Sequence, residues 1–181
     1  MSILLGILGF AAALVILLLI IALFVKKEYA LEREIIINRP VGEVYNYIKL
    51  LKNQDNYSVW NRIDPGMQKT YTGIDGTIGF LYAWDSKNKK AGKGEQEIVN
   101  VQQDERLGMK IHFIKPFEGM ANAYLTTTAV AAGQTKVKWG LDSSMKYPMN
   151  IMLLFMNMES MLGKDLAAGL ADLKTILEKQ D

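Results

Sequence analysis

The chain ends in the stretch YPMNIMLLFMNMESMLGKDLAAGLADLKTILEKQ, residues 147–180, whose apolar residues recur every three or four positions. Such spacing is typical of one stripe of an α-helix. The residues of this stripe are Ile151, Phe155, Met158, Leu162, Leu166, Leu170, Leu173 and Leu177. Because proline is tolerated in the first turn of a helix, we predict one long helix from Pro148 to about Gln180. Its first part, up to Met158, carries no charge, which indicates a segment that is buried or faces something apolar.

The stretch before this helix, residues 67–144, alternates apolar and polar side chains as β-strands do. We predict six antiparallel strands, at residues 67–73, 77–85, 94–102, 106–115, 119–130 and 135–144. Asp75-Gly76 is a strong signal for the first hairpin turn. In the second strand, one face would hold Ile78, Phe80, Tyr82 and Trp84.

Residues 29–38 read as a further strand, 40–51 as a helix and 53–63 as short helical turns. The whole order is therefore strand, helix, short helix, six strands and a long helix. This order predicts an α+β fold, in which the helices gather on one face of an antiparallel sheet.

Residues 3–25, ILLGILGFAAALVILLLIIALFV, contain no polar side chain. As a helix they would span roughly 35 Å, and a bilayer core needs about 20 such residues. The run is too long for a signal peptide and has no basic residue ahead of it. We predict that residues 1–27 form a single-pass anchor in the plasma membrane and that 28–181 form one domain. Lys26 and Lys27 favour the cytoplasmic side for that domain, and the outer side is the alternative.

The charge and composition of the domain exclude several functions. Residues 28–181 carry 19 basic and 19 acidic side chains once Lys26 and Lys27 are set apart, so the positive excess of a nucleic-acid binder is missing. The chain has no cysteine, which excludes disulfides, thiol catalysis and thiolate-bound metals. Its single histidine, His112, argues against a catalytic triad or a multi-histidine metal site. We therefore predict no cofactor and no metal.

Five segments carry a resemblance to a known family. They are REIIINRPVGEVYNYI (33–48), YSVWNRIDPGM (57–67), GTIGFLYAWDS (76–86), GKGEQEIVNV (92–101) and YPMNIMLLFMNMESMLGKDLAAGLADLK (147–174). With the order of elements, they resemble the START-like, birch-pollen-allergen-like superfamily (SRPBCC), in particular its bacterial polyketide cyclase/dehydrase branch. The resemblance implies a helix-grip fold, a curved antiparallel sheet around the long C-terminal helix, over residues 28–181. It does not fix function, because members range from lipid carriers to a few enzymes.

The resemblance also implies an apolar cavity between the sheet and the long helix. We predict that it is lined by Trp60, Tyr82, Trp84, Met109, Trp139, Met152, Phe155 and Met156. Six of the ten methionines fall between Met145 and Met161, and methionine suits surfaces that accept varied apolar ligands. The alternative is that these residues fill a solid core.

Few polar residues suggest chemistry. Glu95 and Glu97 share one face of a strand; facing inward they could form an acid–base pair, and facing outward they are a solvated edge, which is commoner. His112 alternates with Met109 and Ile111, which indicates the outer face. Arg62 and Asp64 could hold a ligand head group or form a surface ion pair. The lysines of residues 87–93 could contact anionic lipids or simply be a solvated hairpin tip.

Three functions follow, in order of preference. The first is a membrane-anchored module that binds an apolar small molecule or lipid. The second is an interaction domain with a solid core. The third is an enzyme of the cyclase or dehydratase kind acting on an apolar substrate, for which Glu95, Glu97, Tyr82 and His112 are the only candidate groups. A polar pair inside the cavity would favour the enzyme, and a cavity lined by apolar groups the binding module.

Overall fold

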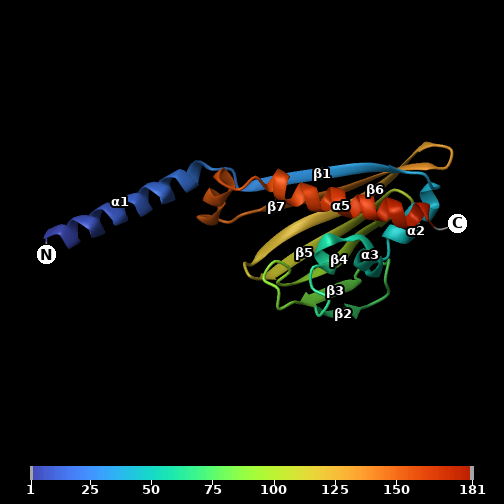
Figure 1. Ribbon diagram of the computed structural model, residues 1–181, viewed down its shortest axis with the longest axis horizontal. Coiled ribbons are helices and arrows are strands. Elements are labelled where there is room, and N and C mark those ends of the chain that lie inside the picture. The colour runs from blue at the N-terminus through green and yellow to red at the C-terminus, as the bar shows by residue number, and fades with distance from the viewer. Residues whose placement is uncertain (1, 180–181) are drawn as a thin grey trace.

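The structure is a computed structural model that describes residues 2–179. A long N-terminal helix, α1 (Ser2–Phe24), projects from a domain of one sheet and several helices (Figure 1). The first half of the domain consists of β1 (Glu28–Ile37), α2 (Val41–Ile48), a 3₁₀ turn η1 (Leu51–Asn53), α3 (Gln54–Tyr57) and α4 (Val59–Arg62). The other strands are β2 (Gln68–Thr72), β3 (Leu81–Asp85), β4 (Lys93–Gln102), β5 (Arg106–Lys115), β6 (Gly119–Ala131) and β7 (Gln134–Ser144). The chain ends in a 3₁₀ helix, η2 (Met149–Leu154), and in α5 (Met158–Glu178).

The seven strands form one antiparallel sheet in the order β1-β7-β6-β5-β4-β3-β2. The six strands from β2 to β7 follow one another as a meander, and β1 closes the sheet by pairing with β7. Register shifts in β4 opposite β5, and in β6 opposite β7, mark irregularities in the ladder. Bulges of this kind increase twist and bend a sheet. The predicted α+β class and the helix-grip arrangement are confirmed, since the curved sheet holds α5 against its inner face (Figure 1).

The alternation predicted for the strands decides which side chains form the core. In β5, Leu107, Met109 and Ile111 are buried, while Lys110 between the last two is exposed. In β7, Val137, Trp139 and Leu141 do the same. Successive side chains of a strand point to opposite faces, so every second residue reaches the concave side that α5 covers.

The C-terminal helix is shorter than predicted. Its stripe is buried from Leu166 to Leu177, as expected, but the helix does not begin at Pro148. Residues 149–154 form a 3₁₀ helix, and α5 starts anew after Asn157, whose side chain accepts a hydrogen bond from the Ser160 amide at 2.9 Å. Asparagine at this position satisfies one of the free amides of a helix start, so it stabilises a new helix in place of a continuous one.

The second predicted strand is also shorter. Strand β3 begins at Leu81, because Gly73 and Gly79, with φ near +90°, turn the chain just before it. Ile78 therefore lies in a turn, 65% exposed, and the prediction that it shares a face with Phe80, Tyr82 and Trp84 is wrong. The other three do face the inner side: Phe80 and Tyr82 are buried, and Trp84 packs against the core.

The helix α1 is long and apolar enough to cross a membrane, by its length and composition. It is tied to the domain at its end. The side chain of Asn150 in η2 donates to the carbonyl oxygens of Ala22, at 2.7 Å, and Val25, at 3.0 Å. Because the last carbonyls of a helix have no partner within it, these bonds satisfy the end of α1. The helix α1 is therefore connected to the domain in two ways: the chain runs on from it into β1, and η2 is hydrogen-bonded to its end (Figure 1).

Candidate functional site

A cavity of about 300 Å³ lies between the concave side of the sheet and the helices that cover it. Its walls come from α3, α4, the strands β3 to β7 and the start of α5. The residues that line it are Tyr29, Gln54, Ser58, Trp60, Asn61, Met67, Tyr82, Trp84, Lys90, Ala91, Gln96, Ile111, Phe113, Lys115, Pro116, Phe117, Ala123, Trp139, Leu141, Met158 and Leu162. The presence of this space shows that the interior is not solidly packed. Because most of the lining residues are apolar, the cavity suits an apolar molecule.

Aromatic rings form much of the wall. All three tryptophans of the chain, Trp60, Trp84 and Trp139, line the cavity. Trp60 and Trp139 meet edge to face with ring centroids 6.0 Å apart, and Tyr82 stacks on Trp84 at 5.6 Å. The Trp84 indole also donates to the Ala91 carbonyl oxygen at 3.0 Å, which fixes its ring at the edge of the cavity. Rings held in this way are rigid apolar surfaces for a ligand.

Two buried glutamines, Gln54 and Gln96, line one part of the cavity, its polar end. The amide nitrogen of Gln96 lies 2.8 Å from the sulfur of Met109, and that of Gln54 lies 3.7 Å from the same atom. Both glutamines are buried, and no hydrogen bond among the described residues uses either amide oxygen. A thioether is a weak acceptor, so these amides are only partly satisfied. They can bind a polar group at the tip of an otherwise apolar ligand.

The hydroxyl of Tyr82 is a further polar group of the cavity lining. It lies 3.7 Å from the sulfur of Met67. Burial, followed by the negative charge of Asp55, raises the pKa of Tyr82 well above its ordinary value. The phenol therefore stays protonated at neutral pH, where it can donate a hydrogen bond and cannot act as a base.

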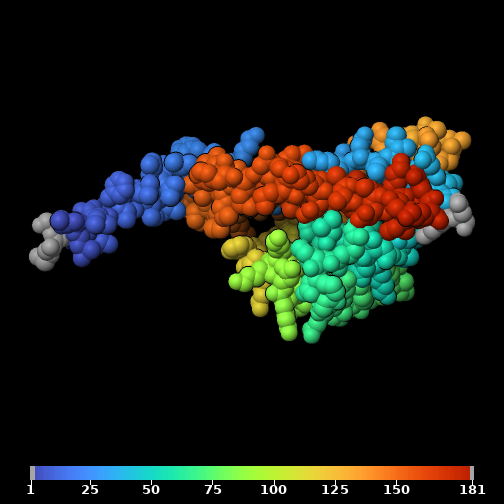
Figure 2. Space-filling view, in the orientation of Figure 1, coloured from blue at the N-terminus to red at the C-terminus, as the bar shows by residue number. Residues whose placement is uncertain are grey.

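The cavity opens at the end of the domain from which α1 leaves. Lys90, Lys115 and Phe117 of the lining are exposed and lie at the opening, and Tyr29, Met158 and Leu162 of the lining are partly exposed. The space-filling view shows the molecule hollowed between the start of α5 and the loops around residues 86–92 and 116–118 (Figure 2). The mouth is thus close to the joint between α1 and the domain.

The structure brings four of the eight predicted lining residues together in the wall: Trp60, Tyr82, Trp84 and Trp139. Met109 lies behind the wall, buried beneath the two glutamines. The last three do not line the cavity. Met152 lies in η2, Phe155 is 81% exposed, and Met156 lines a shallow hollow beside the end of α1. The break before α5 is the reason, because it turns this segment away from the sheet.

The carboxylates considered for catalysis lie on the outer face of β4. Glu95 faces His112 across the ladder, with 3.2 Å between carboxylate oxygen and Nδ1, and Glu97 is exposed. The second ring nitrogen of His112 lies 3.6 Å from Glu118. None of these residues lines the cavity, so the inward arrangement needed for an acid–base pair is not formed. The described residues also contain no cluster of side chains that could hold a metal ion.

Arg62 and Asp64 join elements of the domain together. Arg62 pairs with Asp172 of α5 and reaches the Tyr57 carbonyl oxygen at 3.3 Å. Asp64 accepts from the Ser86 hydroxyl and from the Gly66 amide at 2.9 Å. These hydrogen bonds, the Ser86 one first, lower the pKa of Asp64. Arg62 thus forms its ion pair with Asp172 of α5 rather than with Asp64, whose carboxylate is hydrogen-bonded to Ser86 and Gly66.

Sequence reasoning missed the polar end of the cavity. Gln96 lies between Glu95 and Glu97, the two glutamates considered for catalysis, and the alternation of β4 places it on the opposite, inner face. Its register partner Ile111 belongs to a face already assigned to the core, so the pairing of β4 with β5 was the available signal. Gln54 and Ser58 sit on short helical turns, which carry no comparable pattern.

No protein-family model matches the chain, and neither does any curated protein sequence. Solved structures do. Norcoclaurine synthase from Thalictrum flavum, in complex with dopamine and hydroxybenzaldehyde, has a TM-score of 0.60 and 8% identity over 85% of this chain and 88% of its own. A protein from Nitrosospira multiformis has a TM-score of 0.56 and 16% identity over 82% and 96%. The Aha1 dimer from Colwellia psychrerythraea has a TM-score of 0.56 and 12% identity over 83% and 97%.

These likenesses cover most of this chain and nearly the whole of each solved chain. At such low identities they show the fold alone, and the comparison transfers no activity. Together with the observed sheet order and the long C-terminal helix, they show that this chain has the helix-grip fold.

Proposed function

We propose that the chain is a membrane-anchored module that binds a hydrophobic small molecule or lipid in the cavity. One observation carries the proposal: the domain encloses about 300 Å³ of mostly apolar space that ends at two buried, partly satisfied glutamines. Ligand sites are commonly apolar clefts of this size or larger with a few placed polar groups. A solved protein of the same fold holds dopamine and hydroxybenzaldehyde, which supports small organic molecules as ligands of such a cavity.

The composition of the lining favours binding over acid–base catalysis. Among the described residues that line the cavity there is no aspartate, glutamate or histidine. The two lysines, Lys90 and Lys115, lie at the mouth, and the interior polar groups are amides and hydroxyls. Such groups orient a ligand through hydrogen bonds, each worth about 1 kcal/mol, and apolar contact supplies roughly 25 cal/mol per Å² of buried surface.

The anchor follows from α1. Its residues are almost all exposed and apolar, which is stable only if the helix is surrounded by something other than water. Residues 1–27 would form this anchor and residues 28–181 the domain. Lys26 and Lys27 follow the helix directly, so we place the domain on the cytoplasmic side of the plasma membrane.

Native mass spectrometry of the full chain, released from detergent micelles in the gas phase, tests ligand binding. We expect one apolar molecule bound per chain. The variant Ala123→Phe, which fills the cavity from its β6 wall, should lose that molecule. Because the new ring enters existing space, the variant should fold with little cost in stability, which near-ultraviolet circular dichroism would verify. Lipids held by α1 would remain in both proteins, so they cannot imitate the result.

A pair of variants on β4 tests the polar end. Gln96→Leu should lower affinity for an apolar probe that bears a hydroxyl, such as a long-chain alcohol, by about tenfold relative to the matching hydrocarbon. Glu97→Leu, next to it on the outer face, should leave both affinities unchanged. Quenching of the three cavity tryptophans reports binding in both cases.

In the mass-spectrometry test, equal amounts of bound molecule in wild type and Ala123→Phe, or no bound molecule in either, would contradict the proposal.

The anchor has its own test. The chain lacks cysteine, so the single variant Lys110→Cys carries the only thiol. After carbonate washing, the full chain should stay in the membrane fraction. A membrane-impermeant maleimide should label the thiol only after the cells are opened. Labelling of intact cells would place the domain outside, and release by carbonate would argue against spanning.

A further inference from the structure

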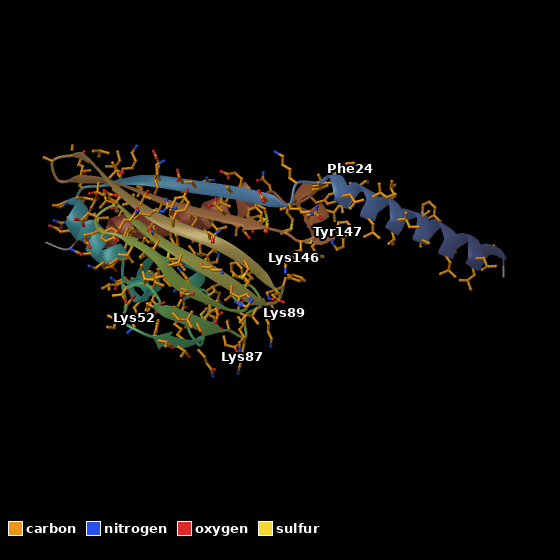
Figure 3. All side chains as sticks on the ribbon, turned by 180° about the vertical axis from the view of Figure 1, so that it is seen from behind. Phe24, Lys52, Lys87, Lys89, Lys146 and Tyr147 are labelled. Atoms are coloured by element: carbon orange, nitrogen blue, oxygen red, sulfur yellow. The ribbon has the colours of Figure 1, made fainter. Side chains whose placement is uncertain are left out.

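Four segments meet at the end of the domain from which α1 leaves, and we call their surface the basal face: residues 24–29, 86–91, 114–118 and 145–157. The Met145 amide donates to the Lys27 carbonyl oxygen at 2.8 Å, and Asn150 is bonded to the end of α1. Lys90 of the second segment and Phe117 of the third both line the cavity and are both exposed. Figure 3 shows Lys87, Lys89, Lys146 and Tyr147 at this end, with Phe24 at the base of α1.

The basal face is strongly basic. Its segments contain seven lysines, at positions 26, 27, 87, 89, 90, 115 and 146, against two glutamates, Glu28 and Glu118, a net of +5. The whole chain carries +2, so everything outside the basal face carries −3. None of these seven lysines forms an ion pair within the described residues, whereas Lys69, Lys93, Lys136, Lys138 and Lys174 all do. Their charge is thus available to a partner.

The same face exposes large apolar side chains. Phe155 is 81% exposed, Phe117 69%, and Leu154 56%, and Tyr147 and Met149 are also exposed. Phenylalanine at such exposure costs free energy in water and is favourable at an apolar boundary. Apolar and aromatic side chains flanked by lysines are the composition of surfaces that bind the lipid interface.

The joint between α1 and the domain fixes how this face would meet a membrane. Asn150 is fully buried and holds the last turn of α1 to η2. In the view of Figure 3, a line drawn across α1 at Phe24 runs toward Lys146, Lys89 and Lys87. Lys52, in contrast, lies well away from that line, in the half of the domain remote from α1.

We propose that the basal face docks on an anionic lipid bilayer, with Phe117 and Phe155 in the interface and the lysines at the head groups. This rests on the proposed function, in that α1 must span the same bilayer. The anionic cytoplasmic leaflet is the matching surface for the charge. Because Lys90, Lys115 and Phe117 surround the mouth of the cavity, docking places that mouth against lipid. An apolar ligand then passes between bilayer and cavity without crossing water.

Single cysteines test the docking directly. The full chain would be placed in nanodiscs of phosphatidylcholine mixed with phosphatidylglycerol, with an environment-sensitive dye on Phe117→Cys, Phe155→Cys or, as the control, Lys52→Cys. We expect blue-shifted emission and several-fold weaker quenching by aqueous iodide at positions 117 and 155 than at 52. Labels at 117 and 155 that are quenched as strongly as the label at 52 would overturn the proposal.

The charge contribution has a matched control. The triple variant Lys87→Gln, Lys89→Gln, Lys146→Gln should lose most of the protection from iodide. The triple variant Lys49→Gln, Lys52→Gln, Lys110→Gln, outside the basal face, should keep it. Discs of phosphatidylcholine alone, or 1 M salt with its Debye length of about 3 Å, should weaken protection in the wild type. If protection of the labels from iodide is the same at every lipid charge and salt concentration and in both triple variants, the electrostatic part of the proposal is overturned.

The docking and the proposed function fail in different ways. A chain that does not elute with the discs overturns the anchor, and docking with it. A chain that elutes with the discs, and still binds its ligand by mass spectrometry, but leaves positions 117 and 155 open to iodide overturns docking alone.

Discussion

At the scale of single residues, one cluster on the outer face of the sheet links three strands. Glu32 of β1 accepts from the Tyr124 hydroxyl at 2.7 Å and from the Lys138 ammonium at 2.9 Å. The Tyr124 ring lies over Gly140 of β7, where any side chain would collide with it. The hydrogen bond from Tyr124, and then Lys138, lower the pKa of Glu32. Burial, and then the bond to Glu32, raise the pKa of Tyr124 to about 12.

These shifts predict how stability depends on pH. The folded state favours the ionised form of Glu32, so its contribution is present above the ordinary glutamate pKa and lost as pH falls through the lowered value. Glu32→Gln should therefore flatten the fall in unfolding free energy between about pH 6 and pH 3. Because Glu32 is partly exposed, the change should be below about 1 kcal/mol. Denaturant unfolding in detergent measures it.

Glu34 provides the control, since it lies two residues along the same face, 3.6 Å from Lys138, and makes no bond to Tyr124. Glu34→Gln should change the acid limb of the curve less than Glu32→Gln does. A larger effect from Glu34→Gln than from Glu32→Gln would refute the assignment.

At the scale of elements, α5 is shaped by two glycines with different surroundings. A Cβ on Gly169 would lie 2.8 Å from the Trp139 ring and 3.2 Å from the Tyr57 carbonyl oxygen. A Cβ on Gly163 would meet the guanidinium of Arg33, the mobile tip of a long side chain. At Gly169 the helix therefore packs tightly against the aromatic wall of the cavity. At Gly163 it faces β1 through the Arg33 side chain, which can move.

The two glycines predict opposite outcomes for the same substitution. Removing a glycine from a helix gains up to about 1 kcal/mol. Gly169→Ala should nevertheless destabilise the domain by about 1–2 kcal/mol, because overpacking against Trp139 costs more. Gly163→Ala should be neutral or stabilising, because Arg33 can move and its pair with Glu159 is exposed. Thermal unfolding compares the two variants. A stabilising effect of Gly169→Ala would show that the Trp139 ring moves to make room for the added methyl group, against the prediction.

At the scale of the whole molecule, a few hydrogen bonds set the direction of α1 relative to the sheet. Asn150 is buried, and its side-chain amide nitrogen donates hydrogen bonds to the carbonyl oxygens of Ala22 and Val25. Its own oxygen has no partner among the described residues. No flexible linker separates Phe24 from β1. The domain is thus held at a defined angle to the helix.

Loss of this joint should free the domain without unfolding it. Asn150→Ala should broaden the distance distribution between spin labels on Leu14→Cys and Lys52→Cys, measured by pulsed electron resonance in nanodiscs. Asn157→Ala is the matched control, because that side chain caps α5 by accepting from the Ser160 amide, whereas the bonds to the end of α1 come from Asn150. It should cost about 1 kcal/mol of stability and leave the distribution narrow. Equal widths in all three proteins would show that the joint does not orient the domain.

The sequence by itself determined the local elements and the class of fold. The apolar run of α1, the alternation in β5 and β7, and the stripe Leu166 to Leu177 are read correctly because side-chain period follows from backbone geometry, which is local. The resemblance to START-like proteins added the helix-grip arrangement, which the sheet order and solved structures confirm. Tyr82, Trp84 and Trp139 of the cavity wall were also within reach, because they lie on well-patterned strands, whereas Trp60 lies on a short helical turn.

Tertiary structure alone decided which face of each strand is concave and where the chain breaks. Gln96 rather than Glu95 enters the cavity because the register of β4 against β5 selects that face. Phe155 points outward because the cap at Asn157 starts a new helix where the pattern favoured a continuous one. The basal face joins residues more than a hundred positions apart. Such placements depend on contacts between distant segments, and a periodic pattern within one segment carries no information about them.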